Sequence, residues 1–342
     1  MDFTPTEEQR AAAELAARIF GDLSTHERLT AAGTGSDTGL WKELCAAGLV
    51  AAVADTGLLG LVLLLEEQGR TTAQVPFAAS CVYGLLALTA HGSPEQRERL
   101  LPGIADGTVV VTGAPADSGV RSASGRLTGV LPAVPWLRDA THVLVADDRR
   151  RLRLVRTAEA AASEPVELTA PWSAGRLTLD GTPGEAVGAA GAYDDMLATA
   201  RTAFAGLQAG VCAGSLARAV EHTNTREQFG QPLAVRQGVQ LRAADAYMDT
   251  EAIRVTAYEA AWRRDAGLPY AAHALTAAWW ASEAGQRVVH TGQHLHGGAG
   301  ADLAHPVHRH FLWGRQLDAY LGCGGELLQE LGELIANGEA GT

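Results

Sequence analysis

Four long stretches of helical periodicity in the C-terminal half constrain the fold of this chain most. Helices of this length can bury their apolar stripes only against one another. We therefore predict a four-helix bundle over residues 186–342. Its helices are expected at about residues 191–225, 232–266, 269–295 and 307–336.

The N-terminal part, residues 1–106, carries the start signals of shorter helices. Thr6 precedes the acidic residue Glu7, an order typical of a capped helix start. Ser93 followed by Pro94 marks another start, with serine as the cap and proline at the first helical position. We predict an all-α domain over this range.

Between these parts the sequence changes to short runs separated by Gly, Pro, Asp and Ser. The clearest runs are Thr108–Thr112, His142–Ala146 and Arg151–Val155. Their length and spacing are typical of strands and predict a small antiparallel barrel or sandwich. The predicted fold class is α+β, with domains at residues 1–106, 107–185 and 186–342.

Charge and cysteine content exclude several classes of function. The formal net charge is −12 and the pI is about 5.4, whereas nucleic acids and anionic membranes are bound through clustered basic residues. We expect neither as a partner. The four cysteines are far apart, form no Cys-x-x-Cys pair and follow no signal peptide, which favours reduced thiols in a cytoplasmic protein.

The most apolar run, residues 46–65, is interrupted by Asp55 and three glycines and ends before a pair of glutamates. Such a run is too broken for a membrane span. We predict a buried helical hairpin there.

Sequence motifs of the C-terminal third carry a resemblance to a known family. Residues 226–232 read Arg-Glu-Gln-Phe-Gly-Gln-Pro, residues 295–300 read Leu-His-Gly-Gly-Ala-Gly, and residues 305–309 read His-Pro-Val-His-Arg. In this order, with Glu66–Arg70 and Gly92–Gln96 ahead of them, they make the whole chain similar to the acyl-CoA dehydrogenases. The resemblance implies an all-α domain, a β domain and a four-helix bundle. It also implies FAD, whose pyrophosphate and adenosine reach a neighbouring subunit.

The resemblance assigns roles to individual residues. Arg226 and Gln228 match the positions that hold the FAD phosphates, and a guanidinium can pair with two phosphate oxygens at once. The alternative is a solvated helix end with Phe229 as a buried anchor. His294 stands where the family usually carries glutamine, so the adenosine contact is altered. The implied cofactor-binding residues are Arg226, Gln228, Phe229, Gln237, His294, Gly297, Gly298, Gly300, Thr112 and Ser118.

On the substrate side, Arg201 matches an arginine near the CoA in the first bundle helix. The alternative is a structural ion pair with Asp194 or Asp195. Asp245 matches the helix that contributes to the subunit interface, and we expect it to make a buried structural hydrogen bond.

The catalytic carboxylate of the family is missing. Removing the α-proton of an acyl thioester requires a positioned base, which contributes roughly 100- to 10,000-fold to the rate. The two family positions for this base fall on Leu321 and Ala200, and neither accepts a proton. Asp318 and Glu326 are the nearest substitutes, with a solvated or capping role as the alternative. The loop around Thr112 also departs from the family pattern, so we expect a degenerate flavin-ring pocket.

Several histidines stand close together near the C-terminal glycines: His296, His305, His308 and His310. No carboxylate completes a metal-binding set with them. We expect structural histidines and no metal.

Three functions fit these observations. The chain resembles the base-lacking subunit of the α2β2 acyl-CoA dehydrogenases that actinobacteria use on bulky thioesters such as sterol side chains, in which a homologous subunit supplies the glutamate. Alternatively, it is a self-sufficient flavoenzyme with a relocated base, as a homo-oligomer, acting on acyl-CoA or acyl-carrier thioesters in specialised metabolism. Thirdly, the fold is repurposed as a non-redox member of the family.

Overall fold

The computed structural model describes residues 2–114 and 119–338. The chain groups into two compact units. The bundle unit comprises residues 1–13, 62–73 and 201–342, and the sheet unit comprises residues 14–61 and 74–200. This grouping differs from the predicted three-domain division, which stays a prediction.

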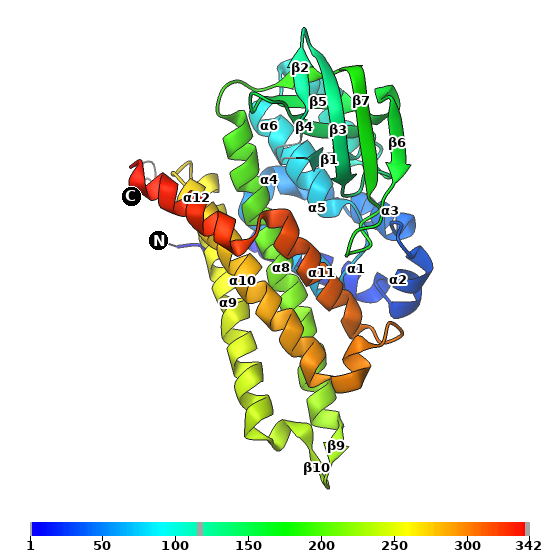
Figure 1. Ribbon diagram of the computed structural model, residues 1–342, viewed down its shortest axis with the longest axis vertical. Coiled ribbons are helices and arrows are strands. Elements are labelled where there is room, and N and C mark those ends of the chain that lie inside the picture. Colours follow the sequence, from blue (N-terminus) through cyan, green and yellow to red (C-terminus); the bar gives the residue numbers. More distant parts are fainter. Residues whose placement is uncertain (1, 115–118, 339–342) are drawn as a thin grey trace. The chain divides into compact units, whose positions relative to one another are not determined.

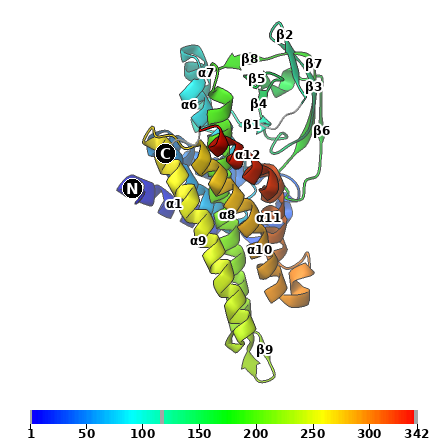
Figure 2. The ribbon, with the colours of Figure 1, turned by 60° about the vertical axis from the view of Figure 1, so that its left-hand side comes forward.

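Long helices form the bundle unit and lie side by side (Figures 1 and 2). Helix α10 packs against α9, α11 and α12. The last predicted helix, residues 307–336, is in fact two helices, because Gly322 has a φ of 96° and ends α11. The helices are α8 (Ala192–Thr225, in this unit from Arg201 onward), α9 (Gln237–Asp265), α10 (Ala271–Leu295), α11 (Val307–Leu321) and α12 (Gly324–Ala336).

A two-stranded hairpin joins α8 to α9, visible at the lower end of Figure 1. Strand β9 (Glu227–Gln228) pairs with β10 (Gln231–Pro232). The turn between them has positive φ at both central residues, 57° at Phe229 and 75° at Gly230, as a tight hairpin turn requires. Because the hairpin lies between the two helices, α9 begins at Gln237, later than the predicted start at about residue 232.

The end of α4 (Leu49–Thr71) crosses α8 at backbone contact. A Cβ atom on Gly69 would lie 2.2 Å from the Leu207 carbonyl oxygen, and one on Gly210 would lie 2.0 Å from that of Glu66. Only glycine fits at such a crossing. Within α4, Gly57 has non-helical dihedrals (φ 71°, ψ −163°), so two helical segments meet there at a kink, inside the range of the predicted helical hairpin.

Both predicted helix starts are confirmed. Ser93 Oγ accepts from the Gln96 amide at 3.2 Å and Gln96 Oε1 accepts from the Ser93 amide at 3.0 Å, with Pro94 beginning the helix. Thr6 and Gln9 bond in the same reciprocal way. The N-terminal helices are α1 (Glu7–Leu23), α2 (His26–Ala32), α3 (Thr38–Ala46), α5 (Phe77–Ala79), a π-helical turn (Ser80–Leu86), α6 (Ala87–His91) and α7 (Pro94–Ala105).

Two four-stranded sheets pack in the sheet unit around a shared apolar core. One has the order β1 (Val111–Ala114), β4 (His142–Ala146), β5 (Leu152–Arg156), β8 (Glu185–Val187), and the other β2 (Arg121–Ala123), β3 (Arg126–Val134), β7 (Gly175–Pro183), β6 (Ala162–Pro165). The core includes Leu131 and Leu177 from one sheet and Val143 and Val155 from the other. The predicted sandwich is therefore present. It is not wholly antiparallel, because β1 and β4 run parallel.

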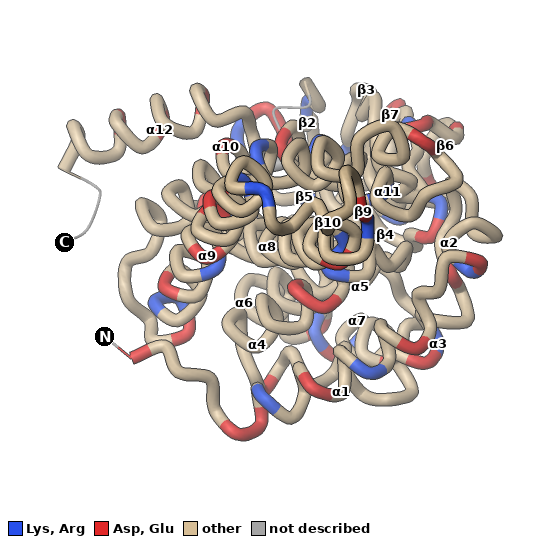
Figure 3. The backbone as a smooth tube through the Cα atoms, turned by 90° about the horizontal axis from the view of Figure 1, so that it is seen from below, with Lys and Arg blue, Asp and Glu red and all other residues tan. Residues whose placement is uncertain are grey.

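Helices α4 and α8 are long and apolar enough to cross a membrane, but 61% and 72% of their most apolar windows are buried within the protein. They are core helices by this measure. Helix α9 carries acidic and basic residues along its whole length, and the two signs are interspersed (Figure 3).

Candidate cofactor-binding site

A cleft of about 630 Å³ lies in the bundle unit where α8, the hairpin, the start of α9 and the end of α10 meet. It brings together Arg226, Gln228, His294, Gly297 and Gly298, which are distant in sequence. None of its lining residues is a carboxylate, although the chain carries a net charge of −12. The remaining lining residues are His222, Leu233, Val239, Leu295, His296 and Ala299.

The glycine turn after α10 exposes its backbone to this cleft. Gly297 has a φ of 61°, and a Cβ atom added to Gly297 or Gly298 would meet no atom within 4 Å. Gly300 is different, because its Cβ atom would lie 2.2 Å from the Gln293 carbonyl oxygen. Gln293 Nε2 also donates to the Gly300 carbonyl at 3.2 Å. The first two glycines leave room for a ligand, whereas Gly300 shapes the turn.

The hairpin presents Arg226, Gln228 and Phe229 as exposed side chains. The alternative of Phe229 as a buried anchor is wrong, because its side chain is 93% exposed. The Arg236 guanidinium lies 5.4 Å from the centre of its ring. An exposed aromatic ring beside guanidinium groups can stack on a planar ligand.

Two other predicted residues occupy α9. Gln237 is the first residue of the helix and is exposed, and it is not among the residues that line the cleft. The expectation of a buried hydrogen bond for Asp245 is wrong, because the residue is exposed.

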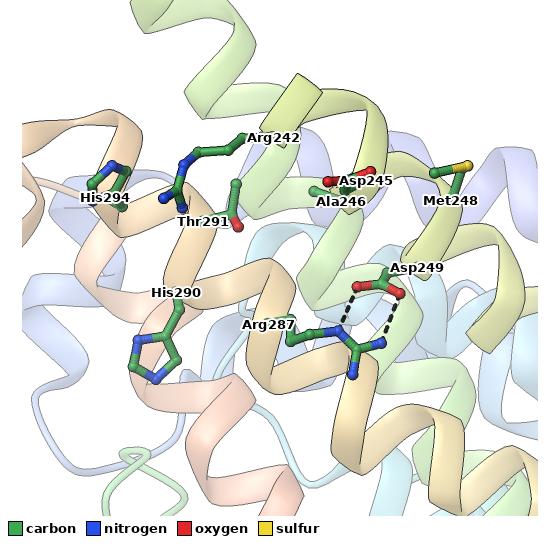
Figure 4. Close-up of a pocket in the computed structure, with 9 residues that line it drawn as sticks. All are labelled: Arg242, Asp245, Ala246, Met248, Asp249, Arg287, His290, Thr291 and His294. Atoms are coloured by element: carbon green, nitrogen blue, oxygen red, sulfur yellow. Dashed lines mark hydrogen bonds and ion pairs between the residues drawn. The ribbon is translucent and has the colours of Figure 1, made fainter. Parts of the chain in front are cut away.

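Asp245 lines a separate groove of about 840 Å³ between α9 and α10, whose side chains are drawn in Figure 4. His294 lines this groove as well as the cleft. Arg287 donates two hydrogen bonds to Asp249 across the groove, at 2.9 and 2.8 Å. The groove thus carries paired charges of both signs, unlike the cleft.

His222, which the sequence interpretation did not connect with His296 and His305, lies beside these two histidines at the cleft. The rings of His222 and His296 stack with centroids 4.6 Å apart, and His296 lies 5.0 Å from His305. Desolvation is the main cause that lowers the pKa of all three, and the mutual repulsion of their positive forms lowers it further. The distance in sequence between His222 and the other two hid this arrangement.

His310, by contrast, lies away from the cleft lining and is fully buried. Its Nε2–H donates to the Arg70 carbonyl oxygen at 3.0 Å. Burial lowers its pKa to about 4, so the ring is neutral at physiological pH. Within the described ranges, no group of three or more His, Cys, Asp or Glu side chains is placed to hold a metal ion.

The predicted flavin-ring residues lie in the sheet unit. Thr112 is buried, and its hydroxyl donates to the Pro135 carbonyl oxygen at 2.6 Å. A Cβ atom on the next residue, Gly113, would lie 2.5 Å from the Tyr83 ring. Thr112 and Gly113 of strand β1 are therefore enclosed by packing within the sheet unit. Ser118 lies outside the described residues.

The predicted substrate residue Arg201 is engaged by a carboxylate on α12. Its guanidinium makes two hydrogen bonds to Glu330, at 2.8 and 2.6 Å. Arg201 therefore forms an ion pair, as the alternative predicted, but its partner is Glu330 and not Asp194 or Asp195. Asp194 pairs with Arg150 and Asp195 with His91.

The structure places both predicted substitutes for a base at Ala200 or Leu321, namely Asp318 and Glu326, in local surroundings of their own. Asp318 accepts a hydrogen bond from Ser282 and pairs with Arg315 at 3.2 Å, so its carboxylate is already engaged by two neighbours. Glu326 is exposed in the first turn of α12, where a negative charge interacts favourably with the helix dipole. Both fit the structural alternatives better than a catalytic role.

Comparison with known proteins supports the resemblance. Residues 191–332 match the family description "Acyl-CoA dehydrogenase, C-terminal domain", and residues 6–108 match "Acyl-CoA dehydrogenase, N-terminal domain". A curated relative, acyl-CoA dehydrogenase FadE27 of Mycobacterium tuberculosis, is 33% identical over 98% of this chain and 99% of its own length.

Among solved structures, a variant of the Tcur3481–Tcur3483 steroid ACAD is 41% identical, with a TM-score of 0.91 and coverage of 98% of this chain and 99% of that one. The ChsE4–ChsE5 complex from Mycobacterium tuberculosis contains a chain that is 31% identical, also with a TM-score of 0.91 and the same coverage. Butyryl-CoA dehydrogenase from Megasphaera elsdenii shares the fold at 20% identity (TM-score 0.86, covering 98% of this chain and all of that chain).

Proposed function

Because this chain belongs to the acyl-CoA dehydrogenase family, we propose that it is the FAD-binding, base-lacking subunit of a heteromeric acyl-CoA dehydrogenase. In this proposal it completes the cofactor site of a homologous subunit that carries the catalytic glutamate. The observation that carries the proposal is an asymmetry. The cleft of the bundle unit is lined by no acid. By contrast, alanine and leucine stand at the predicted base positions, and the strand at Thr112, which is predicted to face the flavin ring, is packed within the sheet unit.

The residues of the cleft fit the anionic half of FAD. Arg226 can pair with pyrophosphate oxygens, and the backbone at Gly297 and Gly298 is open to close approach. Phe229 offers an exposed ring beside them. When bound, FAD supplies the acceptor for the hydride that leaves the β-carbon of the thioester. The part of this chain is to hold and orient the phosphates.

The missing base argues for a partner. Without a carboxylate beside the α-carbon, the acyl thioester keeps its α-proton. Two relatives with closely similar folds are described as pairs of different proteins, Tcur3481–Tcur3483 and ChsE4–ChsE5. We therefore place this chain in such a pair, with α2β2 stoichiometry.

Helix α9 offers a surface for that partner. Four of its apolar side chains are between 47% and 61% exposed, namely Leu241, Tyr247, Met248 and Val255. Exposed apolar residues gathered on one element favour an interface. The partner is expected to cover this helix and the neighbouring hairpin.

The substrate class follows from the family and from one relative. We propose a CoA thioester, and the description of Tcur3481–Tcur3483 as a steroid ACAD favours a bulky acyl group such as a sterol side chain. Because the apolar helices α4 and α8 are core helices, we place the complex in the cytoplasm.

The test is expression of the chain alone and together with a glutamate-bearing homologue from the same genome. We expect flavin absorbance and acyl-CoA dehydrogenation in the purified pair, and little of either in the chain alone. Replacing the partner's glutamate with glutamine should abolish turnover and leave flavin content unchanged. Full activity of the isolated chain would contradict the proposal, and so would a pair that never retains flavin.

A further inference from the structure

The stacked histidines of the cleft have a geometry suited to holding an anion. His222 comes from the last part of α8, and His296 directly follows α10. Both line the cleft together with Arg226. Their rings are 4.6 Å apart with planes inclined by 25°, so the two imidazoles form one stacked pair at the cleft wall.

The hydrogen bonds of this group define where a proton can enter. His296 Nδ1 lies 2.7 Å from the Gly292 carbonyl oxygen. A carbonyl only accepts, so Nδ1 carries the hydrogen and Nε2 is the atom that gains a proton. His305 Nδ1 accepts from the Val307 amide at 3.2 Å. It therefore holds its own proton on Nε2 and remains a neutral neighbour.

The charged groups around the pair are mostly positive. Arg218 and Arg226 on the α8 side act on His296 and His222, and His305 follows the glycine turn. Asp302 is the acid that acts on His305, and His308 opposes it from α11. Desolvation and these cations keep the pKa of His222 and His296 below the usual value. Without an anion, both rings are thus neutral at physiological pH.

We propose that His222 and His296 are additional phosphate-binding residues and that the stacked pair takes up a proton when a dinucleotide pyrophosphate enters the cleft. This inference rests on the proposed function. A phosphate group supplies the negative charge that the cleft lacks, and it turns a neutral imidazole into a charge-assisted donor. Two positive rings in one stack would repel each other, so the pair takes up a single proton.

The direction in which ligand affinity changes with pH follows from this uptake of a proton on binding. The bound state holds more protons than the free state, so affinity rises as pH falls from about 8 toward 6, by up to tenfold per pH unit. The rise ends once the free histidines are themselves protonated. A cleft that relied on arginine alone would show no such slope.

The experiment is calorimetric titration of the full chain, alone and with its partner subunit, in buffers of different ionisation enthalpy. FAD and ADP are the probes, and adenosine is the phosphate-free control. We expect uptake of roughly one proton near pH 7 with FAD and ADP, and none with adenosine. His222→Gln should remove most of this uptake, and so should His296→Gln. The matched control is His142→Gln, which changes a half-buried histidine of the sheet unit whose pKa is also lowered.

The outcomes separate the two proposals. FAD binding without proton uptake would overturn this inference and leave the proposed function standing. Uptake that persists in both cleft variants would assign the proton to other residues and would also overturn it. Failure of FAD and ADP to bind at any pH, even with the partner present, would remove the proposed function and this inference with it.

Discussion

Two histidine neighbourhoods of the bundle unit place the same side chain in opposite settings. His310 is fully enclosed, donates to the Arg70 carbonyl, and presses against Gly214, where a Cβ atom would lie 2.5 Å from its Nε2. His296 stacks on His222 at a cleft whose glycines have free space before them. Residue type alone does not distinguish a packing histidine from a ligand-facing one. The difference lies in whether the surrounding backbone leaves room for a ligand.

The strongest test of this contrast is a pair of glycine substitutions. In Gly214→Ala the new methyl group would meet the Arg70 carbonyl oxygen at 2.3 Å as well as His310. We expect a loss of about 3 kcal/mol in the free energy of unfolding, despite a gain of ~1 kcal/mol in helix propensity.

Gly298→Leu is the matched change in the cleft, where a Cβ atom meets nothing within 4 Å. It should leave the unfolding free energy within about 0.5 kcal/mol and reduce FAD retention by the pair. Urea unfolding and flavin content measure the two effects. Equal destabilisation by both substitutions would erase the contrast between the neighbourhoods.

The enclosed histidine should also make stability depend on pH. Burial lowers the pKa of His310 from the ordinary histidine value of 6.5 to about 4 in the folded chain, so the unfolded chain binds more protons between these values. The contribution of the neutral His310 ring to the free energy of unfolding is fully present above pH 6.5 and is lost as pH falls toward 4. At ~1.4 kcal/mol per pKa unit, the loss is about 3 kcal/mol.

His310→Gln keeps an N–H donor for the Arg70 carbonyl and removes the titration. Urea unfolding at several pH values should therefore show a flatter decline in the variant than in the unchanged protein. Parallel curves would show that the buried ring does not titrate as its surroundings imply.

In the cleft, Arg226→Ala should act on the ligand and not on the fold. A hydrogen bond to a charged group contributes about 1.5–3 kcal/mol, so FAD binding by the pair should weaken roughly 10- to 100-fold. Arg99→Ala, which removes an exposed ion pair with Glu185, is the control and should leave binding unchanged. Fluorescence titration with FAD measures both variants.

The smallest effect is expected at Arg201. Its partner Glu330 is 45% exposed, and pairs that reach solvent contribute less than about 1 kcal/mol. Glu330→Gln should lower stability by no more than that and leave flavin content unchanged. A large loss of stability would make α12 an essential support of the bundle.

Local signals in the sequence predicted much of the fold. The caps at Thr6 and Ser93 and the helical periods of α8 and α10 depend on neighbours along the chain, and these elements form where expected. The break at Gly322 and the parallel pairing of β1 with β4 depend on backbone geometry and on distant strands. Periodicity carries neither kind of information.

The candidate site divides in the same way. The motif residues Arg226, Gln228, Gly297 and Gly298 do meet in one cleft. The stacking of His222 on His296 and the pairing of Arg201 with Glu330 required the tertiary structure. No spacing in the sequence brings these pairs together, since each joins two different elements.

The glycine crossing of α4 and α8 has a consequence for how such a chain can change over evolution. Because the two backbones touch at Gly69 and Gly210, α8 cannot slide along its neighbour. From Arg201 to Thr225 it spans roughly 36 Å at ~1.5 Å per residue. The contact thus fixes α8 near its middle. A single inserted residue would rotate the side chains at one end of the helix by about 100° about its axis relative to those at the other end. Substitutions can change the side chains at either end of α8, but the number of residues between the two ends is fixed.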